Sequence, residues 1–310
     1  MKYKIPAGLC RLLLIAQFAI TLPMTSCSSN VHQTPDSTGG FRFTPVDLPE
    51  KLEFAGEKVP LEYYDVRENL DRELLSTAYF HSQTIRYVKM APRYFSIIEP
   101  ILKENGIPED FKYLCVAESG FDIRALSPAK AAGFWQLLES TAKEYGLEVN
   151  AEVDERYNIE KATQVACEIL KESFSKYKSW SLVAAAYNGG RAGLDQKMAL
   201  QKANNYYDLL FVEETTRYVF RILALKMVME NPEKYGFKIP KDQLYPIIKT
   251  KNVELKEQIV NFADYAISKG ITYKELKNFN PWLRETYLKN LARKTYILKI
   301  PEKEFRTKTN

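Results

Sequence analysis

The feature that most constrains the fold of this chain is the helical spacing of its apolar residues between about residues 61 and 245. Apolar residues in this stretch recur three and four positions apart, which places them on one face of an α-helix. The stretch shows no sustained alternation of apolar and polar residues, which would indicate β-strands. We therefore predict a mainly α fold, with one helical domain over residues 61–245.

Several helix ends can be predicted from local signals. Pro108, which two acids follow, is expected to open a helix, since proline suits the first helical position and acids suit the positive end of the helix dipole. Ser179 is expected to cap a helix that ends at residues 188–190. A last long helix is predicted over residues 214–236, and residues 162–174 carry one apolar helical face.

Composition limits the classes of function that the chain can have. Its 310 residues, with 20 Tyr and 16 Phe, are enough for one large domain or two smaller ones with a substantial core. The formal charge of +5 includes Lys2, Lys4 and Arg11, which precede Cys27 with no acid among them, so 41 basic residues face 39 acidic ones after that point. This near balance gives no support to a nucleic-acid partner, which requires a concentrated basic surface.

The first 27 residues are predicted to be a lipoprotein signal peptide. Basic residues precede an apolar run, residues 12–22, that is too short to span a bilayer comfortably. The small residues before Cys27 resemble a bacterial lipobox, in which the cysteine is acylated and becomes the new N-terminus. Met24 departs from the branched aliphatic residue that is usual there, and the alternative is an ordinary signal peptide with an incidental Cys27. Residues 28–60 are predicted to be a flexible tether.

The remaining cysteines and histidines do not indicate metal chemistry. Cys115 and Cys167 lie in apolar helical contexts, where two small buried side chains are the favoured interpretation, although export would permit a disulfide. His32 and His81 cannot build a usual zinc site. We therefore expect no metal site and no Ser/His/Asp triad.

A glutamate stands at the end of an apolar helical face. Phe111, Leu114, Cys115 and Glu118 share one face of a helix that Gly120 is expected to end. Partial burial would raise the pKa of this carboxyl and let it hold a proton near neutrality, as a general acid must. The alternative is a structural glutamate turned to solvent or accepting a cap hydrogen bond, and this window alone favours that alternative.

Three further clusters supply aromatic and amide side chains. Gln136 follows a glycine in SPAKAAGFWQ, and Tyr187 and Asn188 stand at the end of a predicted helix in AAYNGG. Glu214 and Tyr218, in ETTRYV, are four residues apart and therefore on one helix face. A carboxylic acid together with aromatic side chains and amides suits a sugar that carries N-acetyl groups.

Taken in order, ESGFD, SPAKAAGFWQ, AAYNGG and ETTRYV resemble the four-motif signature of the family 1 lytic transglycosylases, which have a lysozyme-like fold. The resemblance covers about residues 92–238. It implies that Glu118 is the single catalytic acid/base and that six further residues support the site or bind substrate: Ser119, Gln136, Tyr187, Asn188, Glu214 and Tyr218. Leu138-Glu139 departs from the family, which more often has an apolar residue and proline there, and this puts the geometry of that loop in question.

The resemblance implies a reaction on peptidoglycan that needs no cofactor. Glu118 would protonate the bridging oxygen of the β-1,4 bond between N-acetylmuramic acid and N-acetylglucosamine, then take the proton from the muramic C6 hydroxyl and close a 1,6-anhydro ring. If Asp122 faced Glu118, a hydrolytic muramidase would be the alternative. A non-catalytic glycan-binding lipoprotein is a third possibility. The implied partners are glycan strands and, through the N-terminal lipid, a membrane of the Gram-negative envelope, namely the outer membrane facing the periplasm.

Residues 246–310 are predicted to form a small α+β module with the order strand, helix, short helix, strand. ITYKELKNFNPWL followed by YILKIP is similar to the peptidoglycan-binding LysM module, although the usual Gly-Asp turn is missing. The alternative is a cap that packs on the catalytic domain. A LysM-like binder could be deleted without loss of cleavage, whereas deletion of a cap would unfold the protein.

Overall fold

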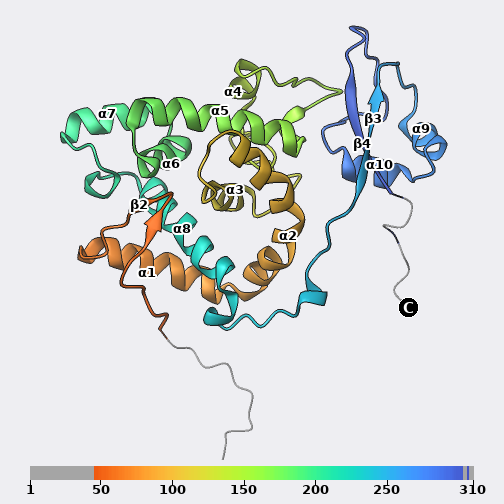
Figure 1. Ribbon diagram of the computed structural model, residues 1–310. Helices are drawn as coiled ribbons and strands as arrows, with labels where there is room; N and C mark the ends of the chain where they lie inside the picture. Colours follow the sequence, from red (N-terminus) through yellow and green to blue (C-terminus); the bar gives the residue numbers. More distant parts are fainter. Residues whose placement is uncertain (1–44, 303–305, 307–310) are drawn as a thin grey trace, which may run out of the picture. The chain divides into compact units, whose positions relative to one another are not determined.

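The computed structural model describes residues 45–302 and residue 306 (Figure 1). The predicted signal peptide, Cys27 and most of the predicted tether lie outside these residues. The α-helices are α1 (Tyr64–Tyr79), α2 (His81–Glu104), α3 (Phe111–Ser119), α4 (Glu139–Glu144), α5 (Ile159–Tyr177), α6 (Trp180–Gly189), α7 (Arg191–Gln201), α8 (Glu213–Glu230), α9 (Phe262–Ser268) and α10 (Tyr273–Phe279). The strands are β1 (Glu53–Phe54), β2 (Glu57–Lys58), β3 (Thr250–Leu255) and β4 (Tyr296–Pro301). The predicted fold class, mainly α with a small α+β C-terminal part, is confirmed.

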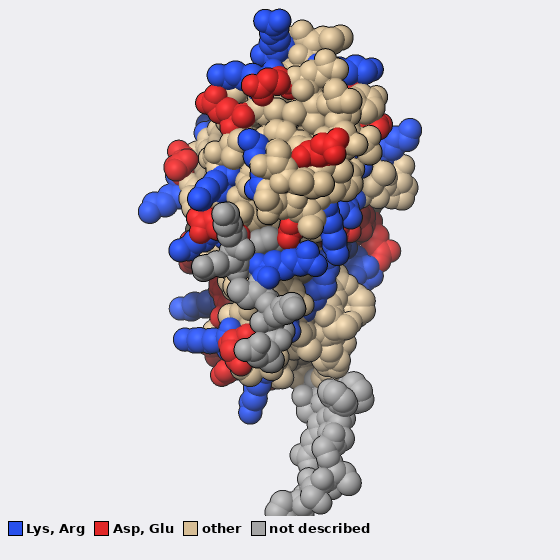
Figure 2. All heavy atoms as spheres, turned by 90° about the vertical axis from the view of Figure 1, so that its right-hand side faces the viewer, with Lys and Arg blue, Asp and Glu red and all other residues tan. Residues whose placement is uncertain are grey.

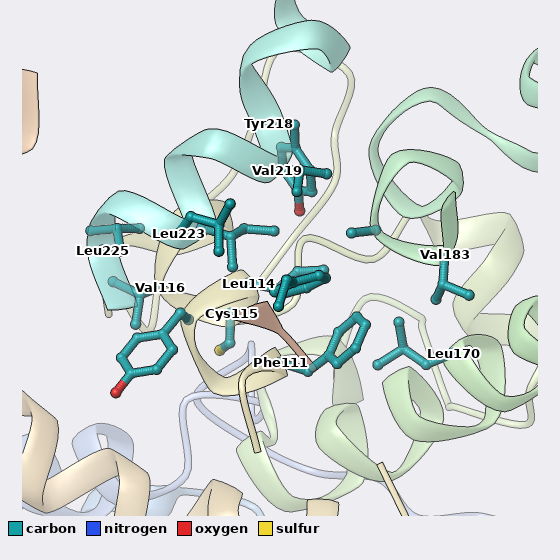
Figure 3. Packing of buried hydrophobic residues seen from close by; sticks show 14 of the residues in the cluster. Phe111, Leu114, Cys115, Val116, Leu170, Val183, Tyr218, Val219, Leu223 and Leu225 are labelled. Carbon is teal, nitrogen blue, oxygen red and sulfur yellow. The ribbon is translucent and has the colours of Figure 1, made fainter. Parts of the chain in front are cut away.

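Helix α3 lies in the core of the helical domain. Six of its nine residues are buried, which requires apolar side chains on more than one face. Figure 3 shows its residues Phe111, Leu114 and Val116 among side chains from three other helices: Leu170 of α5, Val183 of α6, and Val219, Leu223 and Leu225 of α8. Because α3 is held on several sides, the position of its last turn is well determined by packing.

The helix boundaries differ from the predictions at Pro108 and at the end of α8, which stops at Glu230 and not at residue 236. The residues from 64 to 104 form two helices, α1 and α2, because the backbone at Phe80 leaves the helical region (φ −85°, ψ 61°). Pro108 precedes α3 instead of opening it: the amide of Phe111 donates to the carbonyl of Pro108 at 3.1 Å in a turn, and α3 begins at Phe111. Ser179 caps α6 as predicted, accepting a hydrogen bond from the amide of Leu182.

A short hairpin forms within the stretch predicted as a tether. Strands β1 and β2 pair Glu53 with Lys58 and Phe54 with Glu57. Phe54 is fully buried in the core of the helical domain, against the ring of Phe111 with ring centroids 5.4 Å apart. Two-residue strands are too short to show alternation, so the sequence pattern did not indicate them.

The C-terminal elements have the predicted order β3, α9, α10, β4. The two strands are antiparallel, in register from Thr250 opposite Pro301 to Leu255 opposite Tyr296. Helix α10 begins with a capping box between Thr272 and Glu275. On the face of the molecule that carries this module, Lys and Arg side chains form a band across the middle (Figure 2).

The module shares its hydrophobic core with the helical domain. The buried cluster around Leu276 and Trp282 also contains Ala132, Val153 and Tyr157, which precede α5 in the chain. The backbone joins the two parts as well, since the amide of Asp154 donates to the carbonyl of Trp282 at 2.9 Å. The C-terminal module therefore packs as a continuation of the helical domain.

Among residues 45–302 and 306, no helix is long and apolar enough to cross a membrane.

Candidate active site

Glu118 lies in the last turn of α3, as predicted. The helix ends at Gly120, whose backbone is left-handed (φ 55°). A Cβ on Gly120 would come within 2.7 Å of the hydroxyl oxygen of Tyr87. Glycine is therefore required here by both the backbone conformation and the close approach of Tyr87.

Glu118 faces a cleft of about 580 Å³. The cleft is formed by the start of α2 and by the end of α3 with the turn that follows it. Its lining consists of Phe80, Ser82, Gln83, Arg86, Tyr87, Ala117, Glu118, Ser119, Gly120 and Asp122. The mixture of aromatic rings, amides and hydroxyls suits a sugar ring, which presents both apolar faces and hydroxyl groups.

The Glu118 carboxyl is held in a desolvated environment. Burial raises its pKa to about 7, against a hydrogen bond from the Tyr218 hydroxyl and the positive charge of Arg221, which both favour the carboxylate. Burial and the Glu118 charge in turn raise the pKa of Tyr218, so this phenol stays protonated and donates to Glu118. A carboxyl with these properties can both give and recover a proton near neutral pH.

Tyr187 and Asn188 lie at the end of α6 and form hydrogen bonds with the segments that pack beside this helix. The Tyr187 hydroxyl donates to the carbonyl of Trp135 at 2.7 Å, and burial, followed by the nearby Glu118 charge, raises the pKa of the Tyr187 phenol. The Asn188 Oδ1 accepts a hydrogen bond from the Thr215 Oγ1 of α8 at 2.9 Å. The third and fourth sequence motifs are thus joined by a direct contact.

Gln136 and Ser119 are both engaged with nearby backbone. Gln136 has a left-handed backbone (φ 47°), and its Nε2 donates to the carbonyl of Gly133 at 2.8 Å. A Cβ on Gly133 would lie 2.0 Å from the carbonyl oxygen of Arg156, so this loop approaches the backbone before α5 too closely for any other residue. The Ser119 hydroxyl lines the cleft and donates to the carbonyl of Cys115 at 3.1 Å.

Glu214 reaches the site through an arginine that the sequence analysis did not single out. Its carboxylate pairs with Arg221 at 2.8 Å, which lowers the pKa of Glu214. Arg221 also lies 3.6 Å from the buried Glu73 of α1. Arg221 is three residues after Tyr218 on α8, a spacing that could have indicated it, whereas Glu73 is distant in sequence and gives no such signal.

Asp122 is exposed and lines the same cleft as Glu118. Its Oδ1 accepts the backbone N–H of Arg124 at 2.9 Å, so the carboxylate stabilises the turn after α3. Cys115 and Cys167 are both buried and free, as the favoured interpretation had them. Within the part of the chain that the structure describes, no three His, Cys, Asp or Glu side chains are grouped to hold a metal ion.

Comparison with known proteins matches two segments of the chain to families. Residues 95–210 match the transglycosylase SLT domain, and residues 251–304 match the soluble lytic transglycosylase C-terminal LysM-like domain. The resemblance to lytic transglycosylases, predicted from the four motifs, is thus confirmed, and so is the resemblance of the C-terminal segment to LysM modules.

The curated relatives include the membrane-bound lytic murein transglycosylase D of Escherichia coli strain K12 and that of strain O6:H1 (CFT073). Each is 28% identical to this chain over 228 residues, which cover 72% of this chain and 49% of the relative. The chain therefore spans about half the length of the curated relatives that it matches. A solved structure, that of the lytic transglycosylase Slt from Pseudomonas aeruginosa in an inactive mutant form, is 17% identical, with a TM-score of 0.39 over 58% of this chain and 35% of that chain.

Proposed function

We propose that this protein is a lytic transglycosylase of peptidoglycan. It would cleave the β-1,4 bond between N-acetylmuramic acid and N-acetylglucosamine and leave a 1,6-anhydromuramic end. The observation that carries the proposal is the Glu118 carboxyl, which faces a cleft, has a pKa of about 7 and accepts a hydrogen bond from Tyr218. The similarity of residues 95–210 to the transglycosylase SLT domain supports it.

In this reaction Glu118 acts twice. Protonated Glu118 gives its proton to the bridging oxygen as the glycosidic bond breaks. The carboxylate then takes the proton of the muramic C6 hydroxyl, whose oxygen attacks C1 and closes the anhydro ring. The Tyr218 hydroxyl and the Arg221 charge stabilise the carboxylate between the two transfers, and a pKa of about 7 allows both at neutral pH.

The other motif residues would bind substrate or position Glu118. Ser119 lies beside Glu118 in the cleft. We assign the amides of Gln136 and Asn188 to hydrogen bonds with the N-acetyl groups of the substrate, as the motif resemblance implies. We assign Tyr187 to the support of the site, because its hydroxyl donates to the carbonyl of Trp135, which directly precedes Gln136. Glu214 would act by fixing Arg221.

We expect Tyr218→Phe to change the pH dependence of cleavage. Glu118 must enter the reaction protonated, so kcat/KM falls as the pH rises through about 7 in the wild type. Loss of the Tyr218 hydrogen bond removes a group that lowers the pKa of Glu118, so the fall should move to higher pH. The maximal rate should drop roughly 10- to 100-fold, because the carboxylate loses one hydrogen bond. An unchanged pH profile of anhydro-product release, measured with the purified variant, would contradict the assignment.

Substitution of Asp122 distinguishes the proposed reaction from hydrolysis, because this carboxylate lines the same cleft as Glu118. In a hydrolytic muramidase a second carboxylate would act as nucleophile or activate a water molecule, and Asp122→Asn would then abolish cleavage. In the proposed reaction we expect the rate of Asp122→Asn to stay within about 10-fold of wild type, far less than the loss of an essential carboxylate would cause. Mass analysis of the fragments released from purified sacculi gives both the rate of cleavage and the type of product, since anhydro products are lighter than hydrolytic ones by one water.

We also propose that the protein is exported and anchored in the cell envelope by acylation of Cys27, facing the periplasm from the outer membrane. The lipobox-like residues before Cys27 support this, and the E. coli relatives are named as membrane-bound. Cys27→Ala should therefore shift the protein from the membrane fraction to the soluble envelope fraction. An immunoblot of fractionated cells measures this shift. If the variant stays in the membrane fraction and the wild type carries no acyl mass, Cys27 is not an anchor.

A further inference from the structure

Glu73 of α1 is a buried carboxylate that the reaction proposed above does not use. Its side chain is 3% exposed, although glutamate is almost never fully buried unless it is paired. Helix α1 packs along α8 (Figure 1), and the Glu73 carboxylate contacts two arginines of that helix. Its Oε1 accepts a hydrogen bond from the Nε of Arg217 at 2.5 Å, and its Oε2 lies 3.6 Å from the Nε of Arg221. Glu73 is therefore held between two positive charges, which compensate the cost of burying it.

Arg221 lies on the face of α8 that meets the catalytic acid. Glu214, Tyr218 and Arg221 follow one another at spacings of four and three residues, so they form one row along the helix. The middle member of this row, Tyr218, donates a hydrogen bond from its hydroxyl to Glu118. Arg221 pairs with Glu214 at 2.8 Å within the row, and with Glu73 across the contact between α1 and α8. Arg221 thus connects the buried carboxylate of α1 to the site.

Two charged residues of α8 act on Glu118 in opposite directions. The positive charge of Arg221 favours the carboxylate form of Glu118 and so lowers its pKa, whereas the negative charge of Glu214 raises this pKa. A change in how far the charge of Arg221 is compensated should therefore change the pH at which Glu118 loses its proton.

The other titratable groups around Glu118 are neutral or exposed. Burial raises the pKa of the Cys115 thiol on α3, and it also raises the pKa of three nearby phenols: Tyr87 of α2, Tyr187 of α6 and Tyr218 of α8. These four groups therefore carry no charge near pH 7. Arg86 and Asp122 line the cleft but are exposed, so solvent and salt screen their charges. The pairing of Arg221 is thus the feature of the fold that can adjust Glu118 from within the protein.

We propose that Glu73 is a positioning residue of the active site, which holds Arg221 beside Glu118 and Tyr218 and offsets part of its positive charge. This inference rests on the proposed function, because Glu118 is the acid whose protonation Glu73 adjusts. Glu73 precedes residues 95–210, the segment that matches the transglycosylase SLT domain. Helix α1 is then a functional part of the site as well as a packing partner of α8.

The direction of the effect follows from the charges. While Glu73 is ionised it neutralises part of the Arg221 charge, so Glu118 keeps its proton to higher pH. Glu73→Gln retains the shape of the side chain and an oxygen that can accept from the arginines, but it removes the negative charge. Arg221 then favours the Glu118 carboxylate more strongly. The pH at which Glu118 loses its proton should fall by roughly 0.5 to 1 unit from about 7.

The test is a titration of the Glu118 carboxyl that does not depend on turnover. The full chain is prepared with carbon-13 in its glutamate carboxyl groups, and the Glu118 signal is assigned by its absence from Glu118→Gln. We expect a lower titration midpoint in Glu73→Gln and a higher one in Arg221→Gln. Because Glu73 acts through Arg221, adding Glu73→Gln to Arg221→Gln should cause no further shift.

The matched control is Glu213→Gln, which removes one carboxylate from the same group of ion pairs. Glu213 pairs with Arg72 and, at 3.7 Å, with Arg217 instead of Arg221. Its substitution should leave the midpoint of Glu118 unchanged, so a shift in Glu73→Gln cannot be a general effect of lost negative charge near α8.

Arg217→Gln is a second variant, which decides the question if Glu73→Gln does not fold. Arg217 is partly exposed and is the second of the two arginines that contact Glu73. Without Arg217, Glu73 compensates Arg221 more fully, so the midpoint of Glu118 should rise. This rise should be absent when Arg217→Gln is combined with Arg221→Gln.

Three results would overturn the proposal. These are an unchanged or raised midpoint in folded Glu73→Gln, a shift that persists in the Arg221→Gln background, and an unchanged midpoint in Arg217→Gln. A Glu73 that only stabilises the fold would lower the melting temperature and leave the midpoint where it is. The pH dependence of anhydro-product release is measured in parallel, and its fall should move with the midpoint. If the midpoints shift as expected but no anhydro products form, the proposed reaction fails and the role of Glu73 stands. If anhydro products form and the midpoints do not shift, the reaction stands and the role of Glu73 fails.

Discussion

Glu118→Gln is expected to abolish the release of anhydro-muropeptides while leaving the protein folded. The amide keeps the size and polarity of the acid but can neither give nor recover a proton. Loss of general acid/base catalysis costs on the order of 10² to 10⁴-fold in rate, and more where one group performs both proton transfers. The variant should therefore fall to the background of the assay.

The change in stability that Glu118→Gln causes has a predictable sign. Because the pKa of Glu118 in the folded protein is raised to about 7, from an ordinary value of 4.5, ionisation is less favourable in the folded state than in the unfolded one. The contribution of Glu118 to stability is therefore fully present below pH 4.5 and is lost as the pH rises through about 7. Above that pH, Glu118→Gln should melt at the same temperature as wild type or higher. Loss of activity together with a markedly lower melting temperature would instead make Glu118 a structural residue.

Deletion of residues 246–310 is expected to destabilise the whole protein. The truncated chain would expose Ala132, Val153 and Tyr157, which are now buried in the core shared with the module. It would also lose the bond from the amide of Arg284 to the carbonyl of Glu152 at 2.8 Å. Because Ala132 directly precedes the Gly133–Gln136 turn, we expect loss of cleavage together with loss of thermal stability.

The full-length variant Trp282→Ala is a milder version of the same test. Trp282 is 3% exposed and stacks on Tyr296, so its truncation should cost about 3 to 5 kcal/mol of unfolding free energy. Thermal melts and sacculus digestion of both proteins are the measurements. A truncated protein that melts like wild type and still cleaves soluble glycan chains would show that the module is a separable binder, as the LysM resemblance by itself suggested.

The sequence predicted those features that depend on residues close together in the chain. The spacing of Phe111, Leu114 and Cys115 before Glu118, with Gly120 after it, placed the carboxyl at the end of a buried helical face, which is where it lies. The cap at Ser179 and the order of the C-terminal elements follow from equally local signals. Tyr218 and Glu118 are 100 residues apart in the chain, and they form a hydrogen bond. The prediction that both belong to one site came from the motif resemblance and not from helical periodicity.

What the sequence did not reveal depends on tertiary contacts. The ion pair that joins Arg221 to Glu73 needs α1 and α8 side by side, and no local pattern predicts that packing. Ala132 looks like an ordinary loop residue in SPAKAAGFWQ, yet it is fully buried against the C-terminal module. Whether that module caps the catalytic domain could not be decided from its own residues, because the partner surface comes from residues before α5.

The most direct test of the proposed reaction is digestion of purified sacculi in water labelled with heavy oxygen, followed by mass analysis of the new chain ends. In the proposed reaction Glu118 is the only acid/base, and the muramic C6 hydroxyl of the substrate is the nucleophile. No oxygen from water therefore enters the product. We predict 1,6-anhydromuramic ends without the heavy isotope, formed by the wild-type protein and absent with Glu118→Gln. Reducing muramic ends that carry one heavy oxygen would contradict this account and establish a hydrolase.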